Sequence, residues 1–350
     1  MCFVRIGEGM KLKNVWLYSA ILVVLALFSP LTAAKAGKLR EFIKEVMKKR
    51  IDEKALQQSV SSTRHNFEFE GRTRTYYLYL PTTWNKKDPI PVVFLFHGGA
   101  GGGRGALYYY ELETKAEEAG FMLVAPDGTG ETENILLTWN VSFGFGYAQK
   151  NKINDTGFIA ALLEKLSQEF PVDAKRIYAT GLSNGAMFCH WLAAQPENRF
   201  AAIAPVVGTV GGKERHEKDM HLPPTPQTPV SVCIIQGLID ERVLIEGGTQ
   251  KKSITDAREL LSASATIDFW VRANGCDKTA STTFDQSLLT TVHHYTNGLA
   301  GSEVTAYIVH NLGHAWPGST RTPRRGSDKP PQQFKANDII WDFFKAHPRP

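Results

Sequence analysis

Short, uninterrupted apolar segments alternate with amphipathic segments from residue 65 to the end of the chain. The apolar segments predict buried strands, and apolar residues spaced three and four apart predict helices between them. The expected strands cover residues 91–96, 121–125, 176–180, 201–207, 230–235 and 304–309, and the expected helices 105–119, 155–169, 185–194, 255–274 and 332–346. Residues 65–69 and 75–80, with a turn at Gly71, predict an antiparallel pair in front of them. This order predicts one α/β domain over residues 65–350, with a mostly parallel sheet covered by helices on both faces.

The N-terminal segment has a different pattern. Basic residues precede an apolar run over residues 15–31, and small residues follow. This order is typical of a secretory signal peptide, so we predict a signal over residues 1–36, cleaved after Ala34 or Ala36, and a secreted protein. Met10 offers an alternative start of the signal. A retained anchor is the alternative to cleavage, since the run is close to the shortest that spans a bilayer; after cleavage we expect no stable membrane insertion.

Residues 37–64 form the predicted extension, in which residues 38–58 have the spacing of a basic amphipathic helix. This helix could dock on the domain, which we favour, or rest on an anionic membrane surface. Residues 1–54 hold 11 Lys and Arg against 5 Asp and Glu, whereas the other 296 residues hold 29 against 30. The net charge of +5 therefore comes from the N-terminal segment. The main body has no basic field, which excludes a nucleic-acid binder.

The motif Gly181-Leu182-Ser183-Asn184-Gly185 lies directly between a predicted strand and a predicted helix. This is the context of the G-x-S-x-G nucleophile elbow, in which a sharp, strained turn exposes the serine hydroxyl. The turn also points the next backbone N–H, that of Asn184, at the reacting oxygen. An ordinary strand-to-helix turn that happens to contain serine is the alternative.

A nucleophilic serine needs a base and a carboxylate that orients the base, in the chain order Ser, Asp or Glu, His. Asp240 follows the strand at 230–235 and His314 follows the last strand, so we predict both as partners of Ser183. Glu241 and His310 are the nearest competitors, and we expect each to point elsewhere.

A glycine-rich loop, residues 98–103, follows the strand at 91–96. Such a loop can bring a backbone N–H close to the nucleophile, so we predict Gly99 as the second oxyanion donor beside Asn184. Gly98 is the runner-up and an expected substrate contact. His97 is expected to order this loop. A nucleotide site is disfavoured because neither phosphate-loop spacing fits, and no histidine spacing indicates a metal; we therefore predict no cofactor and no metal.

These motifs resemble the polyhydroxybutyrate depolymerase type of secreted esterase, which is close to the feruloyl and acetylxylan esterases of carbohydrate esterase family 1. The similarity rests on residues 96–99, 125–128, 176–185, 236–240 and 313–318, within a match over about residues 65–347. It implies an α/β-hydrolase fold, carboxylic-ester hydrolysis, and Ser183, Asp240 and His314 as the triad.

Substrate choice is less constrained by the sequence than the reaction. Residues 236–238 read Gln-Gly-Leu where the family usually has His-Gly-Thr, and Leu312 replaces a glycine before the base. We expect soluble oligoesters, small esters or aryl esters, with plant-polysaccharide esters as the alternative. Trp139 and Trp316 are candidates to contact substrate, although each could equally be a packing residue.

Two alternative functions and one possible disulfide stay open at this point. The first rival is a serine peptidase on the same fold, and the second is a binding protein that has kept the fold without the activity. A disulfide between Cys233 and Cys276 is compatible with an oxidising compartment, and the sequence does not decide it.

Overall fold

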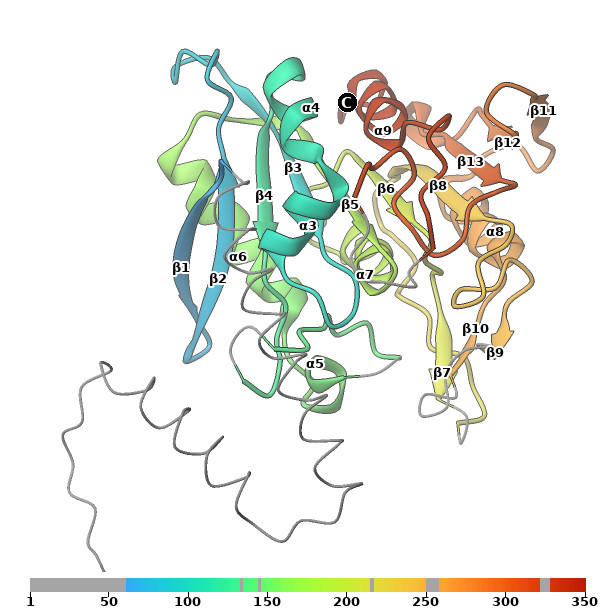
Figure 1. Cartoon of the computed structure of the whole chain (residues 1–350), viewed down its shortest axis with the longest axis horizontal. Helices are drawn as coiled ribbons and strands as arrows, with labels where there is room; N and C mark the ends of the chain where they lie inside the picture. Colours follow the sequence, from blue (N-terminus) through green and yellow to red (C-terminus); the bar gives the residue numbers. More distant parts are fainter. Residues whose placement is uncertain (1–60, 133–134, 144–145, 215–216, 250–257, 322–327) are drawn as a thin grey trace, which may run out of the picture. The chain divides into compact units, whose positions relative to one another are not determined.

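The ten-stranded sheet at the centre of the molecule is parallel in its middle and antiparallel at both edges (Figure 1). The structure is a computed structural model that describes residues 61–132, 135–143, 146–214, 217–249, 258–321 and 328–350. The sheet order is β1-β2-β4-β3-β5-β6-β8-β13-β12-β11. Its strands are β1 (Thr63–Phe69), β2 (Arg72–Tyr79), β3 (Ile90–Phe96), β4 (Met122–Pro126), β5 (Val172–Leu182), β6 (Ala202–Val206), β8 (Ser231–Gly237), β11 (Ser281–Asp285), β12 (Thr290–Tyr295) and β13 (Val304–Val309). The predicted α/β-hydrolase architecture is confirmed.

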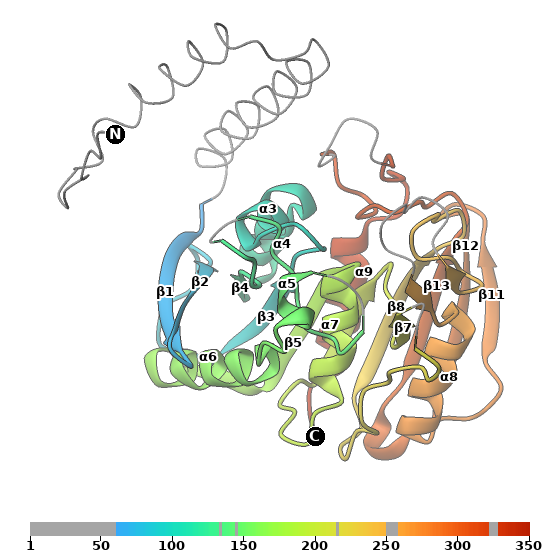
Figure 2. The same cartoon turned by 90° about the horizontal axis from the view of Figure 1, so that it is seen from below.

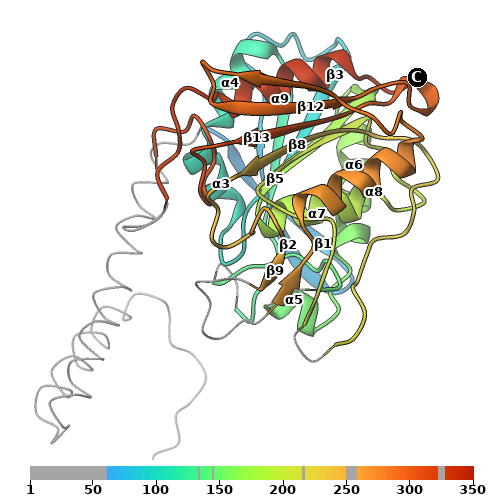
Figure 3. The ribbon, with the colours of Figure 1, turned by 90° about the vertical axis from the view of Figure 1, so that its right-hand side faces the viewer.

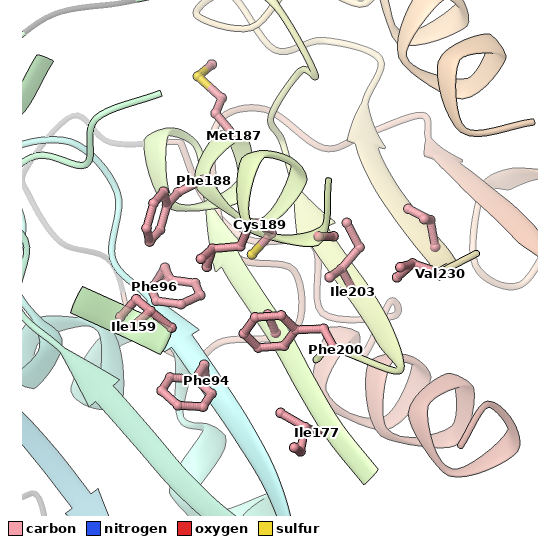
Figure 4. Close-up of a cluster of buried hydrophobic side chains, with 14 of the residues drawn as sticks. Phe94, Phe96, Ile159, Ile177, Met187, Phe188, Cys189, Phe200, Ile203 and Val230 are labelled. Carbon is pink, nitrogen blue, oxygen red and sulfur yellow. The ribbon is translucent and has the colours of Figure 1, made fainter. Parts of the chain in front are cut away.

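Helices cover both faces of the sheet (Figure 2). The first face packs against α6 (Asp155–Glu169), α7 (Asn184–Ala193) and α8 (Ala263–Asn274), and the second against α3 (Gly103–Tyr110), α4 (Leu112–Ala119) and α9 (Ala336–Ala346). In β3, Phe94 and Phe96 point into the first layer, whereas Val93 and Leu95 point into the second. This alternation explains why the strand is apolar throughout: both of its faces are buried. Figure 4 shows part of the first layer, in which aromatic and aliphatic side chains pack together and Phe96 contacts Phe188 of α7.

The carboxyl ends of the parallel strands lie at one edge of the sheet. Strands β4, β3, β5, β6, β8 and β13 all pair in parallel, so their carboxyl ends lie along the same side of the sheet. Figure 3 shows β8 and β13 next to one another, with α8 and α9 on opposite faces. Residues that follow these strands therefore gather at a common edge, the usual position of ligand sites in open parallel sheets.

Several predicted elements differ in extent from the observed ones. The helix expected over residues 105–119 is two helices, α3 and α4, because Glu111 adopts a left-handed conformation with φ 53°. Its carboxylate accepts hydrogen bonds from the backbone N–H and the hydroxyl of Thr320, which lies far along the chain. The helix expected from residue 255 begins at Ala263, and β10 (Arg258–Leu260) precedes it.

Some short elements lie outside the expected pattern. Strands β7 (Gly212–Glu214), β9 (Gly248–Thr249) and β10 form a small separate sheet. A helix of one turn, α5 (Tyr147–Lys150), lies in the loop before α6, and η2 (Leu299–Gly301) precedes β13. The predicted signal peptide over residues 1–36, and all of the predicted extension except residues 61–64, lie outside the described residues.

Residues Ser59–Pro350 form one compact unit, so the unit begins a few residues before the predicted boundary at residue 65. No helix within the described residues is long and apolar enough to cross a membrane. The thiols of Cys189, Cys233 and Cys276 are free and buried, so the Cys233–Cys276 disulfide considered from the sequence is not formed.

Gly185 lets the first turn of α7 lie directly on β3. A Cβ atom at this position would lie 2.6 Å from the carbonyl oxygen of His97 and closer still to that of Phe96. We expect Gly185→Ala to lower the free energy of unfolding by about 3 kcal/mol, because backbone atoms cannot swing away as a side chain could. Denaturant unfolding followed by circular dichroism measures this effect.

Gly105→Ala is the matched control, since Gly105 also lies in a helix but its nearest neighbour to a new Cβ is 4.0 Å away. Here we expect a gain of about 0.5–1 kcal/mol from the reduced freedom of the unfolded chain. Equal stabilities for the two variants would contradict the close packing of α7 on β3.

Candidate active site

Ser183 occupies a strained turn between β5 and α7. Its backbone has φ 56° and ψ −117°, a combination that side-chain-bearing residues rarely adopt. Hydrogen bonds fix the turn on both sides: the Ser183 N–H donates to the carbonyl of Val206 (3.0 Å), and the Ser183 carbonyl accepts from the N–H of Met187 (2.9 Å). The side chain is partly exposed. The local geometry is therefore that of a nucleophile elbow, as the sequence predicts.

Asp240 and His314 meet across neighbouring strands. Asp240 lies in the turn after β8 and His314 in the loop after β13. The imidazole Nδ1 lies 2.8 Å from the carboxylate Oδ2 of Asp240. Because a carboxylate accepts hydrogen bonds, Nδ1 carries the proton in this contact, which leaves Nε2 unprotonated when the ring is neutral.

The Asp240 carboxylate is held in place by more than the imidazole. Its other oxygen, Oδ1, accepts the backbone N–H groups of Arg242 (2.7 Å) and Val243 (3.0 Å). The side chain of Asp240 has no exposed surface, and that of His314 is 8% exposed. No described residue hydrogen-bonds to the Ser183 hydroxyl, and in unliganded enzymes such contacts often tighten only once substrate binds.

The competitors for these two positions have other surroundings. His310 faces Thr291, with its Nε2 2.9 Å from the Thr291 hydroxyl, and its ring lies beside Phe284 at the edge hairpin. Glu241 is exposed. Within the described residues, no group of three His, Cys, Asp or Glu side chains is arranged to hold a metal ion.

Two candidate oxyanion donors have a backbone N–H that lacks an acceptor among the described residues. One belongs to Asn184, the first residue of α7, and the other to Gly99 in the glycine-rich loop. Gly98 packs against the nucleophile, since a Cβ on it would lie 3.7 Å from the Ser183 Cβ. Its N–H, however, donates to the hydroxyl of Tyr110 (3.3 Å). This difference favours Gly99 over Gly98 as the second oxyanion donor.

His97 orders the glycine-rich loop. Its Nε2 accepts the N–H of Gly128 (2.9 Å), so its Nδ1 carries the proton and donates to the carbonyl of Gly98 (2.8 Å). Burial lowers the pKa of His97 to about 4, because the charged ring would lose its hydration. A neutral histidine with both nitrogens engaged is a structural support for the loop.

A second buried histidine, His190 on α7, is equally intolerant of charge. Its Nδ1 accepts the indole N–H of Trp270 (2.8 Å), and burial lowers its pKa to about 3. In the unfolded chain both histidines bind a proton near pH 6.5, whereas the folded protein resists protonation down to these lower values. The free energy of unfolding therefore falls as the pH drops from about 6.5 toward 4. Burial raises the pKa of Asp127 to about 6. Below that pH the folded protein binds a proton at Asp127 more readily than the unfolded chain does, and this offsets the loss of stability caused by one of the two histidines.

We expect His190→Gln, which can still accept the indole proton, to weaken this pH dependence. Between pH 7.5 and pH 5 the wild type should lose about 2 kcal/mol more than the variant, because one buried histidine contributes about 1.4 kcal/mol per pH unit below 6.5. Guanidinium unfolding at both pH values measures the difference. Parallel losses in the two proteins would show that His190 is already protonated in the folded state.

The tryptophans expected to contact substrate are packing residues in this structure. Trp139 has no exposed surface. Its ring stacks on Phe188 (centroids 4.8 Å apart), and its indole N–H donates to the carbonyl of His97 (3.1 Å). Trp316 is 3% exposed and stacks on Tyr110 (4.5 Å). Neither ring offers a face to a bound molecule, so the prediction of direct substrate contact is corrected for both.

Three features of the site have no clear signal in the sequence. The side-chain amide of Asn184 pairs with both backbone groups of Trp139, which joins the elbow to the loop at residue 139. Tyr110 joins the glycine-rich loop to the loop that carries His314 (the base loop): its hydroxyl accepts the N–H of Gly98, and its ring stacks on Trp316. Asp328 accepts the backbone N–H of His314 (2.6 Å). Each contact joins segments that are far apart in the sequence, so local sequence patterns cannot predict it.

The chain is similar to a peptidase family and to several proteins named as esterases. The model of the prolyl oligopeptidase family matches residues 108–222, about a third of the chain, which includes the elbow but neither Asp240 nor His314. NocK of Nocardia uniformis subsp. tsuyamanensis, a protein named as an esterase, is 26% identical over 71% of this chain and 72% of its own length. Feruloyl esterase D of Neurospora crassa is 26% identical over 39% of this chain and 46% of its own length.

Other relatives share one part of the chain or only the fold. The bifunctional acetylxylan esterase/xylanase XynS20E of Neocallimastix patriciarum is 29% identical over 40% of this chain, which is 18% of that longer protein. Among solved structures, the acetyl xylan esterase of Aspergillus awamori superposes with a TM-score of 0.55 at 17% identity, over 81% of this chain and 99% of the other. The chain therefore has the α/β-hydrolase fold, and its relatives indicate a hydrolytic enzyme of the esterase kind.

Proposed function

We propose that this protein is a serine esterase in which Ser183 is the nucleophile, His314 the general base and Asp240 the residue that orients the base. The observation that carries the proposal is the 2.8 Å hydrogen bond between His314 and Asp240, at the sheet edge where the strained turn presents Ser183. A base oriented by a buried carboxylate, together with a serine held in such a turn, is the arrangement that acyl transfer needs.

In the proposed reaction, His314 Nε2 removes the proton of Ser183 as its hydroxyl oxygen attacks the ester carbonyl. The N–H groups of Asn184 and Gly99 stabilise the negative charge on the carbonyl oxygen, helped by the N-terminus of α7. The protonated imidazole then gives its proton to the leaving alcohol, which leaves an acyl group on Ser183. Water, deprotonated by His314, releases the acid and restores the enzyme.

For the substrate we propose small or aryl esters. Leu238 and Ile239, which directly precede Asp240, are 42% and 59% exposed, and Leu136 is 61% exposed in a loop bonded to the glycine-rich loop. Exposed apolar side chains close to these loops support an apolar or aromatic group on the substrate. Relatives whose names refer to feruloyl and acetylxylan esters support the same proposal. The sequence resemblance keeps soluble polyhydroxybutyrate oligomers as a further candidate substrate. We also propose that the protein is secreted, which rests on the N-terminal pattern alone.

A peptidase is the second candidate, because the matching family model is that of prolyl oligopeptidases. The same nucleophile could attack an amide, but amides react less readily and need a protonated leaving nitrogen. A panel separates the two: 4-nitrophenyl acetate, butyrate and octanoate, methyl ferulate, an acetylated xylo-oligosaccharide, a soluble 3-hydroxybutyrate oligomer and a prolyl 4-nitroanilide. We expect turnover of the small and aryl esters and none of the anilide. Preferential cleavage of the anilide would favour the peptidase, and no turnover of any member would favour a binding protein.

A further inference from the structure

A second carboxylate, besides that of Asp240, holds the residue that we propose as the base. Asp328 Oδ2 accepts the backbone N–H of His314 at 2.6 Å. A hydrogen bond from a peptide N–H to a charged oxygen is stronger than one to a neutral carbonyl. Because Asp328 and Asp240 come from different segments, His314 is fixed from two directions: its ring by Asp240 and its main chain by Asp328.

Gly313 makes room for this second carboxylate. A Cβ on Gly313 would lie 2.5 Å from the Asp328 Oδ2 and 2.7 Å from its Cγ, both too close for any side chain. The carboxylate therefore lies against the bare Cα of the residue before the base. The same loop rests on the turn that carries Asp240, since the N–H of Ile239 donates to the carbonyl of Leu312 (3.2 Å).

We propose that Asp328 is a positioning residue for His314: its carboxylate fixes the base loop so that the imidazole stays aligned with the nucleophile. This inference rests on the proposed function. Its consequence is specific, because a misaligned base slows proton transfer without weakening the binding of substrate. Asp328 therefore acts on kcat through His314 and has little effect on KM.

The test compares Asp328→Ala, which removes the acceptor, with Asp328→Asn, which keeps an oxygen in the same place. We expect Asp328→Ala to lower kcat about 10- to 100-fold with KM changed less than twofold. Asp328→Asn should recover kcat to within about threefold of the wild type, because the amide oxygen still accepts the N–H. Asp173→Ala is the matched control: Asp173 also accepts a backbone N–H, that of Lys175 (3.0 Å), but lies at the other end of β5 from Ser183.

A second variant keeps the test decisive if Asp328→Ala folds poorly. Gly313→Ala should displace the carboxylate and lower kcat to a similar degree. Its effect should shrink to less than threefold when it is combined with Asp328→Gly, which also removes the Asp328 Cβ that would lie 2.9 Å from the new one. Full additivity of the two changes, or wild-type kcat in Asp328→Ala, would overturn the proposal.

Ser183→Ala and His314→Ala, measured in parallel, separate this proposal from the proposed function. If both are inactive while Asp328→Ala matches the wild type, Asp328 has no positioning role and the serine-esterase mechanism stands. If Ser183→Ala retains the activity of the wild type, the mechanism itself is wrong, and the positioning role falls with it.

Discussion

Ser183→Ala is expected to abolish ester hydrolysis, with kcat lowered by at least about 10⁴-fold, because no other group in the turn can form the acyl intermediate. The variant should fold like the wild type, since the change removes one partly exposed hydroxyl that no described residue hydrogen-bonds. Steady-state rates on 4-nitrophenyl acetate and thermal unfolding, measured on the same preparations, test both statements.

Ser167→Ala is the control for this substitution. Ser167 lies on α6, and its hydroxyl donates back to the carbonyl of Leu163 within the same helix (2.8 Å). Its replacement should leave kcat within twofold of the wild type. Comparable rates in Ser183→Ala and Ser167→Ala would mean that hydrolysis does not pass through the elbow.

Asp240→Asn is expected to have the next largest effect, a fall in kcat of about 10³- to 10⁴-fold. The amide has nearly the same shape as the carboxylate, but its NH₂ group can face the imidazole as a donor, which favours the tautomer with the proton on Nε2. That tautomer cannot take the proton of Ser183. The loss of the negative charge also removes the stabilisation of the imidazolium that forms during acylation. Rates measured with the variant and its control on one ester give the effect directly.

Asp342→Asn is a suitable control for that variant. Asp342 lies on the exposed side of α9 and pairs with Lys345 (3.1 Å), so its carboxylate is also charged but is open to solvent. We expect its replacement to change kcat less than twofold, because exposed ion pairs contribute little. An Asp240→Asn enzyme that retains a tenth or more of wild-type kcat would show that another group orients the base.

The sequence predicted the parallel strands because each of them contains a short, mostly apolar run whose residues are largely buried on both faces. β3 shows the principle, since all of its side chains are buried and alternate ones belong to opposite helical layers. The position of Ser183 was predictable for a related reason: the flanking glycines and the strand-to-helix order are local features.

What the sequence missed depends on contacts between distant segments. The break between α3 and α4 cannot be predicted from the neighbouring residues, because Glu111 is held by Thr320 from another part of the chain. The two indoles were expected at the substrate, but their neighbours Phe188 and Tyr110 lie elsewhere in the sequence, and burial follows from those neighbours. The contact between Asp328 and His314 belongs to the same class. Periodicity reports which face of an element is buried, and it carries no information about which distant side chain meets it.

In the proposed mechanism, the hydroxyl of Ser183 attacks the ester carbonyl. The most direct test is covalent labelling with a fluorophosphonate that carries an aryl or short alkyl group, followed by mass spectrometry of the proteolysed protein. We predict one phosphonyl group per chain, attached to the Ser183 hydroxyl, with inactivation proportional to labelling and protection by 4-nitrophenyl butyrate. An adduct on a different residue, or full loss of activity without modification of Ser183, would contradict this mechanism.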